Sequence, residues 1–278
     1  MKMKLNEPHP RGQIFGLLGR PSSGKTTLAL TLPRPLLVLA AEKKSYTTLR
    51  NMAQGAVDID VEEFIPLAVP LNSGVGTGDV NDPEAKGAAQ ACYQRFIDYL
   101  RKSVREADSA LAQSATVMLD SGSSWASVFL DLSVDALGHR ASGAQIGKQE
   151  VNDYSKAART FVAVVRQLQV LGKHVVIPIH SSEIRDKDGN VKEIGLALPG
   201  GARSILPSIL DHLFFLSRES VRDGLKFTMQ TRSSGLVQQA FTSWPEMPLA
   251  LDVTVADFKR PGEFGLGKLL KEFSGFNT

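Results

Sequence analysis

The stretch GRPSSGKT, residues 19–26, fits the phosphate-loop pattern G-x-x-x-x-G-K-[ST] at every fixed position. An apolar run over residues 14–18 enters it and a predicted short helix over residues 26–32 leaves it, so the pattern lies in a strand–turn–helix unit. Its two glycines let the backbone approach closely, so that N–H groups and the positive end of the helix can converge on phosphate oxygens. A Gly/Ser turn that fits the pattern by accident is the alternative, and the flanking strand and helix argue against it. The residues that we expect to contact a nucleotide are Gly19, Arg20, Pro21, Ser22, Ser23, Gly24, Lys25, Thr26 and Thr27.

Three side chains near this loop have predicted roles in ATP chemistry. Lys25 is expected to reach the β- and γ-phosphates, and the Thr26 hydroxyl is expected to bind Mg²⁺. A buried strand predicted over residues 36–40 is followed by Glu42, at the carboxyl edge where open parallel sheets bind ligands. Glu42 is therefore the candidate for polarising the attacking water. A solvated acid at the start of a surface loop is the alternative.

Two later apolar strands also end in polar residues. The run TVMLD, residues 116–120, has the form of a Walker B element, in which Asp120 orients Mg²⁺ and its waters. A strand over residues 175–179 ends at His180, whose side chain is expected to face the γ-phosphate and sense it; a histidine that caps the sheet is the alternative. Pro178 is unusual in a central strand and predicts a bulge or an edge at that point.

Composition bounds the class of protein. The chain has 278 residues, of which 42% are hydrophobic, enough for one large α/β core. Its 32 basic and 29 acidic residues permit nucleic acid as a partner without requiring it. The single cysteine, Cys92, excludes an internal disulfide and fits a reducing cytoplasm. No apolar run approaches the ~18 residues of a membrane span, so we expect a soluble intracellular protein without a membrane partner.

Hydrophobic periodicity predicts further elements downstream. Helices are predicted over residues 84–107, 125–137 and 153–171, and Gly172 fits the C-cap of the last one. Residues 181–197 predict either a tight hairpin or a mobile loop. The remaining predicted elements are a strand segment over 64–67, a helical stretch over 202–210, strands over 211–216, 225–231 and 238–241, and a partly helical, amphipathic tail over 257–273.

Prolines near the C-terminus suggest a division of the chain. Residues 1–245 are the predicted core, and residues 246–278 are a predicted extension that docks on the core or on a neighbouring subunit. The sequence has no cluster of cysteine and histidine with the spacing of metal ligands. We therefore expect Mg²⁺ bound with a nucleotide rather than a resident metal centre.

Five features occur in the order and spacing of a RecA-type ATPase core: residues 19–26, 36–42, 117–121, 175–180 and 198–201. The chain resembles this family over about residues 12–242. More closely, it resembles the short phage-encoded nucleotide-binding proteins of the RecA-like Sak type, which are single-strand annealing or recombination proteins. The resemblance implies an α/β fold, a RecA-like P-loop NTPase core with a mainly parallel central sheet flanked by helices, C-terminal antiparallel strands and a short tail.

The resemblance also implies roles for individual residues. Glu42 aligns with the glutamate that activates water, and Asp120 with the Walker B acid. His180 stands where RecA proteins place a glutamine that links the γ-phosphate to DNA. Residues 138–150 and 181–197 fall where the family's two DNA-binding loops lie. The implied DNA-binding residues are Arg140, Lys148, Arg185, Lys187 and Lys192.

The composition of these loops limits the expected DNA affinity. The segment 181–197 holds three basic and four acidic residues, and neither loop contains an aromatic residue for base stacking. We therefore expect contact with DNA to be weak or to need an assembled oligomer. Because RecA-like sites lie between subunits, a basic residue of the neighbour is expected to complete the site. The candidates are Arg232, Lys259 and Arg260, for which a plain surface position is the alternative.

The function predicted from these features is an Mg²⁺- and ATP-dependent ATPase that assembles into a ring or filament and acts on single-stranded DNA in recombination or annealing. A single-strand-binding protein is a candidate partner, and the cytoplasm of a bacterial host is the expected location if a phage encodes the chain. One alternative is a small-molecule or nucleotide kinase, although no Arg-rich lid occurs in the sequence. A second is a nucleotide-switched loader or regulator with little turnover.

Overall fold

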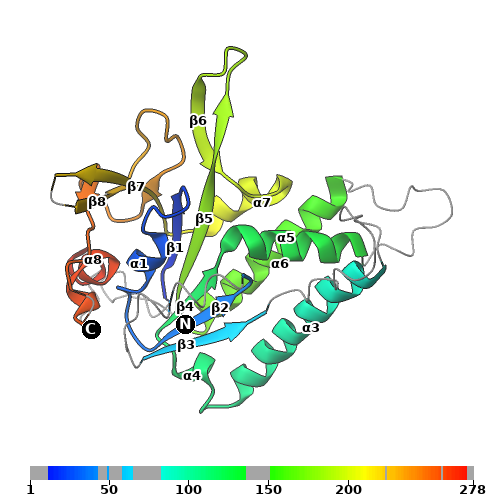
Figure 1. Cartoon of the computed structure of the whole chain (residues 1–278). Helices are drawn as coiled ribbons and strands as arrows, with labels where there is room; N and C mark the ends of the chain where they lie inside the picture. Colours follow the sequence, from blue (N-terminus) through cyan, green and yellow to red (C-terminus); the bar gives the residue numbers. More distant parts are fainter. Residues whose placement is uncertain are drawn as a thin grey trace.

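The computed structural model describes residues 12–42, 49, 58–64, 83–135, 151–222, 224–257 and 259–273, which build an α/β structure around one ten-stranded sheet (Figure 1). The strands are β1 (Ile14–Gly19), β2 (Leu36–Ala40), β3 (Ile59–Glu63), β4 (Thr116–Asp120), β5 (His174–Arg185), β6 (Val191–Leu196), β7 (His212–Val221), β8 (Gly224–Gln230), β9 (Phe241–Thr242) and β10 (Ala250–Asp252).

The strand order is β10-β8-β7-β1-β5-β4-β2-β3, with β6 paired to β5 and β9 paired to β7. The strands from β7 to β3 in this order run parallel, whereas β8, β9 and β10 pair antiparallel at the other side of the sheet. The predicted fold class, a mainly parallel sheet with C-terminal antiparallel strands, is confirmed. Because the central strands are parallel, their carboxyl ends meet at one edge of the sheet.

Helices cover both faces of this sheet (Figure 1). They are α1 (Lys25–Ala29), α3 (Pro83–Arg105), α4 (Ala110–Gln113), α5 (Gly122–Asp135), α6 (Val151–Val170), α7 (Gly200–Ile205) and α8 (Gly265–Phe273), with 3₁₀ turns η2 (Leu206–Ile209) and η3 (Pro261–Glu263). None of the helices in the described part of the chain has both the length and the apolar character needed to cross a membrane.

Each face of the sheet has its own core, because successive side chains of a strand point to opposite faces. In β1, Ile14 and Leu18 pack in the cluster that contains α5 and α6, whereas Phe15 and Leu17 pack in the cluster that contains α1 and α8. All four side chains are fully buried. The run of consecutive apolar residues in β1 therefore reflects a strand covered on both faces.

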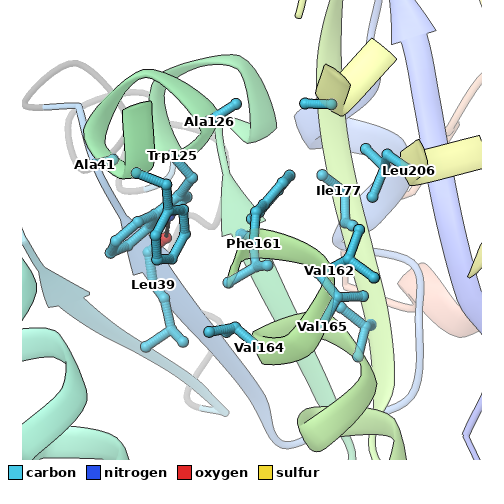
Figure 2. Close-up of a cluster of buried hydrophobic side chains, with 14 of the residues drawn as sticks. Leu39, Ala41, Trp125, Ala126, Phe161, Val162, Val164, Val165, Ile177 and Leu206 are labelled. Atoms are coloured by element: carbon cyan, nitrogen blue, oxygen red, sulfur yellow. Dashed lines mark hydrogen bonds between the residues drawn. The ribbon is translucent and has the colours of Figure 1, made fainter. Parts of the chain in front are cut away.

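Figure 2 shows the core between the sheet and helices α5 and α6. Trp125 of α5 is fully buried, and its indole N–H donates a hydrogen bond to the Leu39 carbonyl at 2.9 Å. Phe161 of α6 and Ile177 of β5 belong to the same cluster. This packing holds the first turn of α5 at the end of β4, which is where the site described below lies.

Two predicted strands differ from the structure, besides the strand predicted over residues 238–241, which lies at Phe241–Thr242. The strand predicted over residues 64–67 lies earlier, at Ile59–Glu63, where it pairs with β2; residues 65–67 lie outside the described residues. Strand β3 is the last strand of the sheet, so polar residues alternate with apolar ones along it. The prediction placed the strand in the apolar run that follows, which is why its bounds were wrong. The second difference is that β5 does not end at His180 but continues to Arg185.

The continuation of β5 pairs antiparallel with β6, so the hairpin alternative for residues 181–197 is confirmed. Its turn closes through a hydrogen bond from the Asp186 N–H to the Asn190 carbonyl at 2.9 Å, and Gly189 has a φ of 84°. Pro178 lies inside β5 opposite Leu17, but the pairing of β5 with β4 ends at Val176. The proline therefore falls where β5 has already lost one neighbouring strand.

The predicted C-terminal extension packs on the rest of the chain. Strand β10 pairs with β8, and Leu266 and Leu270 of α8 are buried in the same core cluster as α1. The Thr31 hydroxyl accepts a hydrogen bond from the Leu266 N–H at 2.9 Å. In the structure, α8 packs on the core of its own chain. The domain boundary at residue 245 stays a prediction.

Gly267→Ala is expected to lower the free energy of unfolding by about 1–3 kcal/mol. A Cβ at this buried glycine would lie 2.0 Å from the carbonyl oxygen of Thr31, a backbone atom, so α8 would have to shift. Gly262→Ala is the matched control, because a Cβ there meets no atom within 4 Å. Equal urea midpoints for the two variants would contradict the described docking of α8.

Candidate nucleotide-binding site

The phosphate loop connects the end of β1 at Gly19 to the start of α1 at Lys25. Gly24 has a φ of 89°, a conformation that L side chains rarely adopt, as the pattern predicts. A Cβ at Gly24 would also lie 2.7 Å from the ring of Phe227. Position 24 therefore requires glycine both for its backbone conformation and for the closeness of a neighbouring strand.

The Lys25 ammonium is held inside the loop. Its side chain donates hydrogen bonds to the carbonyls of Gly19 at 2.8 Å and Arg20 at 2.7 Å, and the residue is 7% exposed. Burial lowers the pKa of Lys25 from 10.5 to about 8, against the opposing effect of the Asp120 and Glu42 carboxylates. The lysine is thus partly desolvated, and it can exchange its two carbonyl partners for phosphate oxygens.

The Glu42 carboxylate is oriented by two serines that follow β4. The Ser121 hydroxyl donates to Oε1 of Glu42 at 2.7 Å, and the Ser124 hydroxyl donates to the same oxygen. The two hydroxyls lie 3.0 Å apart. These two hydrogen bonds orient the Glu42 carboxylate, a group that can accept a proton from water.

Asp120 ends strand β4, and His180 lies within β5 opposite Gly19 of β1. Asp120, the last residue of β4, is 7% exposed. Nδ1 of His180 is buried, with no hydrogen-bond partner among the described residues, and its backbone N–H donates to the Ser123 hydroxyl at 3.1 Å. Burial and the positive charge of Lys25 lower the pKa of His180, although Glu42 opposes the shift, so the ring is neutral at pH 7.

These groups line one cavity of about 460 Å³, within the size range of ligand pockets. Its walls include residues 21–27, Glu42, Asp120 and His180, so most of the predicted phosphate-binding, metal-binding and catalytic residues meet at one cavity. The predicted residues Gly19 and Arg20 are not among its lining residues. The prediction missed three lining residues, Ser121, Pro178 and Phe227. Ser121 follows the Walker B strand directly, and Ser124 lies in the first turn of α5. Their closeness to this strand is the one local signal that could have identified the two serines beside Glu42.

The donor set of the cavity fits Mg²⁺ bound together with a nucleotide. Among the described residues, no group of three or more His, Cys, Asp or Glu side chains could hold a metal ion alone. Mg²⁺ keeps several waters and uses one or two carboxylates plus substrate phosphates. One hydroxyl, Thr26, and the Asp120 carboxylate in the same cavity supply what such an ion needs from the protein.

Three of the predicted DNA-binding residues, Arg185, Lys187 and Lys192, do not line this cavity. Arg185, at the end of β5, donates to the Gly189 carbonyl at 2.7 Å and pairs with Glu183, while Lys187 and Lys192 are exposed on the β5–β6 hairpin. Arg140 and Lys148 lie outside the described residues.

The predicted trans-acting residues also do not line the nucleotide cavity of their own chain. Arg232 donates to the Pro245 carbonyl, and Arg260 pairs with Asp257 and Glu263 at 3.2 Å each. Lys259 and Arg260 line a separate cavity. Their action on a neighbouring subunit stays a prediction.

Two solved structures are similar to this chain at low identity. The flagellar accessory protein FlaH of Methanocaldococcus jannaschii has 12% identity and a TM-score of 0.42, with 88% of this chain and 86% of that chain covered. The KaiC-like protein PH0186 of Pyrococcus horikoshii OT3 has 13% identity and a TM-score of 0.40, with 79% and 78% covered. No match was found among curated proteins.

A family model is more decisive, because it covers most of the chain, including the phosphate loop, the Walker B strand and His180. The model described as AAA domain matches residues 11–238. Together with the strand order and the phosphate loop, this match shows that the chain belongs to the AAA domain family and is a nucleotide-binding ATPase with a RecA-like P-loop fold.

Proposed function

We propose that the chain binds ATP and Mg²⁺ in the cavity beside the phosphate loop, hydrolyses ATP there, and uses this hydrolysis to act on single-stranded DNA in recombination or strand annealing. The observation that carries the proposal is the convergence of Lys25, Thr26, Glu42 and Asp120 on one cavity. They supply an ammonium for phosphates, a hydroxyl and a carboxylate for Mg²⁺, and a second carboxylate as base. A ring or filament of identical subunits is the proposed working form.

In the proposed reaction, Glu42 accepts a proton from a water molecule as that water attacks the γ-phosphorus. A bond forms from the water oxygen to phosphorus, and the bond from phosphorus to the β–γ bridging oxygen breaks, which releases ADP and phosphate. Lys25 stabilises the charge on the phosphate oxygens, and the neutral His180 ring can donate one hydrogen bond to the γ-phosphate. Mg²⁺ held by Thr26 and Asp120 would offset the negative charge of the phosphates.

The β5–β6 hairpin supports a link from this site to a bound partner. It continues the strand that carries His180, and it projects from the body of the molecule (Figure 1). Arg20 of the phosphate loop pairs with Glu183 of the hairpin. A nucleotide that displaces Arg20 would therefore release one anchor of the hairpin, so that occupancy of the cavity alters what the hairpin can bind.

Single-stranded DNA is expected to stimulate ATP hydrolysis, and the stimulation should shrink between about 50 and 200 mM salt because phosphate contacts release counterions. Steady-state hydrolysis with and without an oligonucleotide measures this effect, with Lys25→Ala as the blank. Equal hydrolysis rates with and without the oligonucleotide at both salt concentrations would contradict the proposal that the chain acts on DNA. It would favour a kinase or a nucleotide-switched regulator instead.

A further inference from the structure

A second cavity, of about 520 Å³, lies at the opposite edge of the sheet from the nucleotide site. It is lined by Arg34, which precedes β2, and by Asp58, which precedes β3. Both strands are parallel members of the central sheet, so these residues lie at amino ends, whereas the nucleotide cavity lies at carboxyl ends. The other wall is formed by η3 and α8.

The lining of this cavity is predominantly basic. Of the described residues that line it, four are basic and two, Asp58 and Glu263, are acidic. Arg260 and Glu263 pair with each other at 3.2 Å, which offsets one charge of each sign. The remaining basic residues are Arg34, Lys259 and Lys271, and none of them forms an ion pair within the described part of the chain. Asp257 also pairs with Arg260 at 3.2 Å and attracts Lys259. Among the described residues, four basic side chains therefore stand against the carboxylates of Asp58, Glu263 and Asp257. The balance is positive, and an anion would be attracted.

The Arg34 side chain has a hydrogen-bond donor that lacks an acceptor. Its Nε is buried and has no hydrogen-bond acceptor among the described residues. A buried donor without an acceptor destabilises the structure unless a ligand or water supplies one. A guanidinium group binds phosphate through a fork of N–H donors, and the Arg34 residue lines the cavity, so its guanidinium can supply such donors there.

The shape and chemistry of the walls limit what part of a ligand is recognised. Among the residues that the structure describes, no aromatic side chain lines the cavity, so these residues offer no surface on which a base could stack. A Cβ at Gly262 would meet no atom within 4 Å, so the backbone there is open to a ligand. The cavity is thus suited to phosphate groups themselves rather than to a nucleobase.

We infer that this cavity is a second anion site, which binds phosphate groups carried on a chain, either the phosphodiester backbone of single-stranded DNA or a free polyphosphate. The inference that the bound phosphates belong to DNA rests on the proposed function, whereas the inference of an anion site does not. Helix α1 runs between the two sites, since its first residue, Lys25, lines the nucleotide cavity and Thr31, two residues beyond its end, lines this one.

The test compares two double variants made in the Lys25→Ala background, which removes phosphate binding at the nucleotide cavity. Lys259→Gln/Lys271→Gln removes two charges from the second cavity. Lys156→Gln/Lys268→Gln removes two exposed charges outside it, one of them from the same helix, α8. All four lysines are exposed, so both double variants should fold. The probes are inorganic tripolyphosphate, by calorimetry, and a fluorescein-labelled thymidine oligonucleotide, by anisotropy.

Tripolyphosphate binding is expected to weaken about tenfold in Lys259→Gln/Lys271→Gln and less than about twofold in the control. The slope of log affinity for the oligonucleotide against log salt should fall by about 1.4, because two single-strand phosphate contacts are lost. Weakened tripolyphosphate binding without any oligonucleotide binding would support the anion site and overturn its DNA source. Equal effects of the two double variants, or no binding of either probe by the parent, would overturn the inference. So would a change in oligomeric state of Lys259→Gln/Lys271→Gln with unchanged phosphate binding, which would mark the cavity as a subunit interface.

Discussion

Glu42→Gln is expected to slow ATP hydrolysis by about 10²–10⁴-fold and to leave ATP affinity within about twofold. The amide has the shape of the carboxylate, and its oxygen can still accept hydrogen bonds from Ser121 and Ser124. The amide cannot take a proton from water, so only the step that needs a base is lost. Single-turnover hydrolysis and equilibrium ATP binding, measured on the same preparation, separate the two effects.

Glu246→Gln is the matched control, because this glutamate is exposed and lies outside the cavity. It should hydrolyse ATP at the rate of the parent. Hydrolysis at the parental rate in Glu42→Gln would show that another group activates the water. A fall in ATP affinity as large as the fall in rate would show instead that Glu42 shapes the cavity rather than acting as the base.

ATP affinity is expected to fall above pH 8, by up to about tenfold per pH unit. In the folded protein, the Lys25 side chain has a pKa of about 8, because burial disfavours its ammonium form. ATP binds the ammonium form, so above this pH a proton must be taken up before the phosphates are held. Equilibrium binding of ATP between about pH 7.5 and 9.5 measures the slope, since the nucleotide itself has finished titrating there.

The same pKa shift affects folding in the opposite direction. An unfolded Lys25 keeps its proton up to its ordinary pKa of 10.5, so folding releases a proton between about pH 8 and 10.5. The burial penalty of the ammonium is present in full below pH 8 and is relieved as the pH rises through this range.

Lys25→Ala removes the ammonium that holds the phosphates, so this variant should bind ATP at least about a hundredfold more weakly and lose the pH dependence of binding. An equal slope in Lys25→Ala would show that a different group titrates.

The sequence predicted those site residues that lie at the carboxyl ends of buried apolar runs. Glu42, Asp120 and His180 each follow a buried apolar run, and parallel strands place all three at one edge. Sequence order alone therefore predicts that they converge with the phosphate loop.

The parts that were not predicted depend on contacts between distant segments. Phe227 reaches Gly24 only because β8 folds back antiparallel on β7, and no local pattern encodes that pairing. The hydrogen bonds of Ser121 and Ser124 to Glu42 join residues about 80 positions apart. Strand β5 was predicted to end at His180 because the apolar residues end there, whereas the hairpin beyond it is held by backbone pairing with β6.

An experimental structure of the chain with Mg²⁺ and a non-hydrolysable ATP analogue is the most direct test of the proposed site. We expect the triphosphate to lie against residues 19–26, with the Lys25 ammonium moved from the carbonyls of Gly19 and Arg20 to phosphate oxygens. We also expect a water molecule between Glu42 and the γ-phosphate. An analogue bound elsewhere, or Lys25 still on its two carbonyl partners beside a bound analogue, would contradict the assignment of this cavity as the ATPase site.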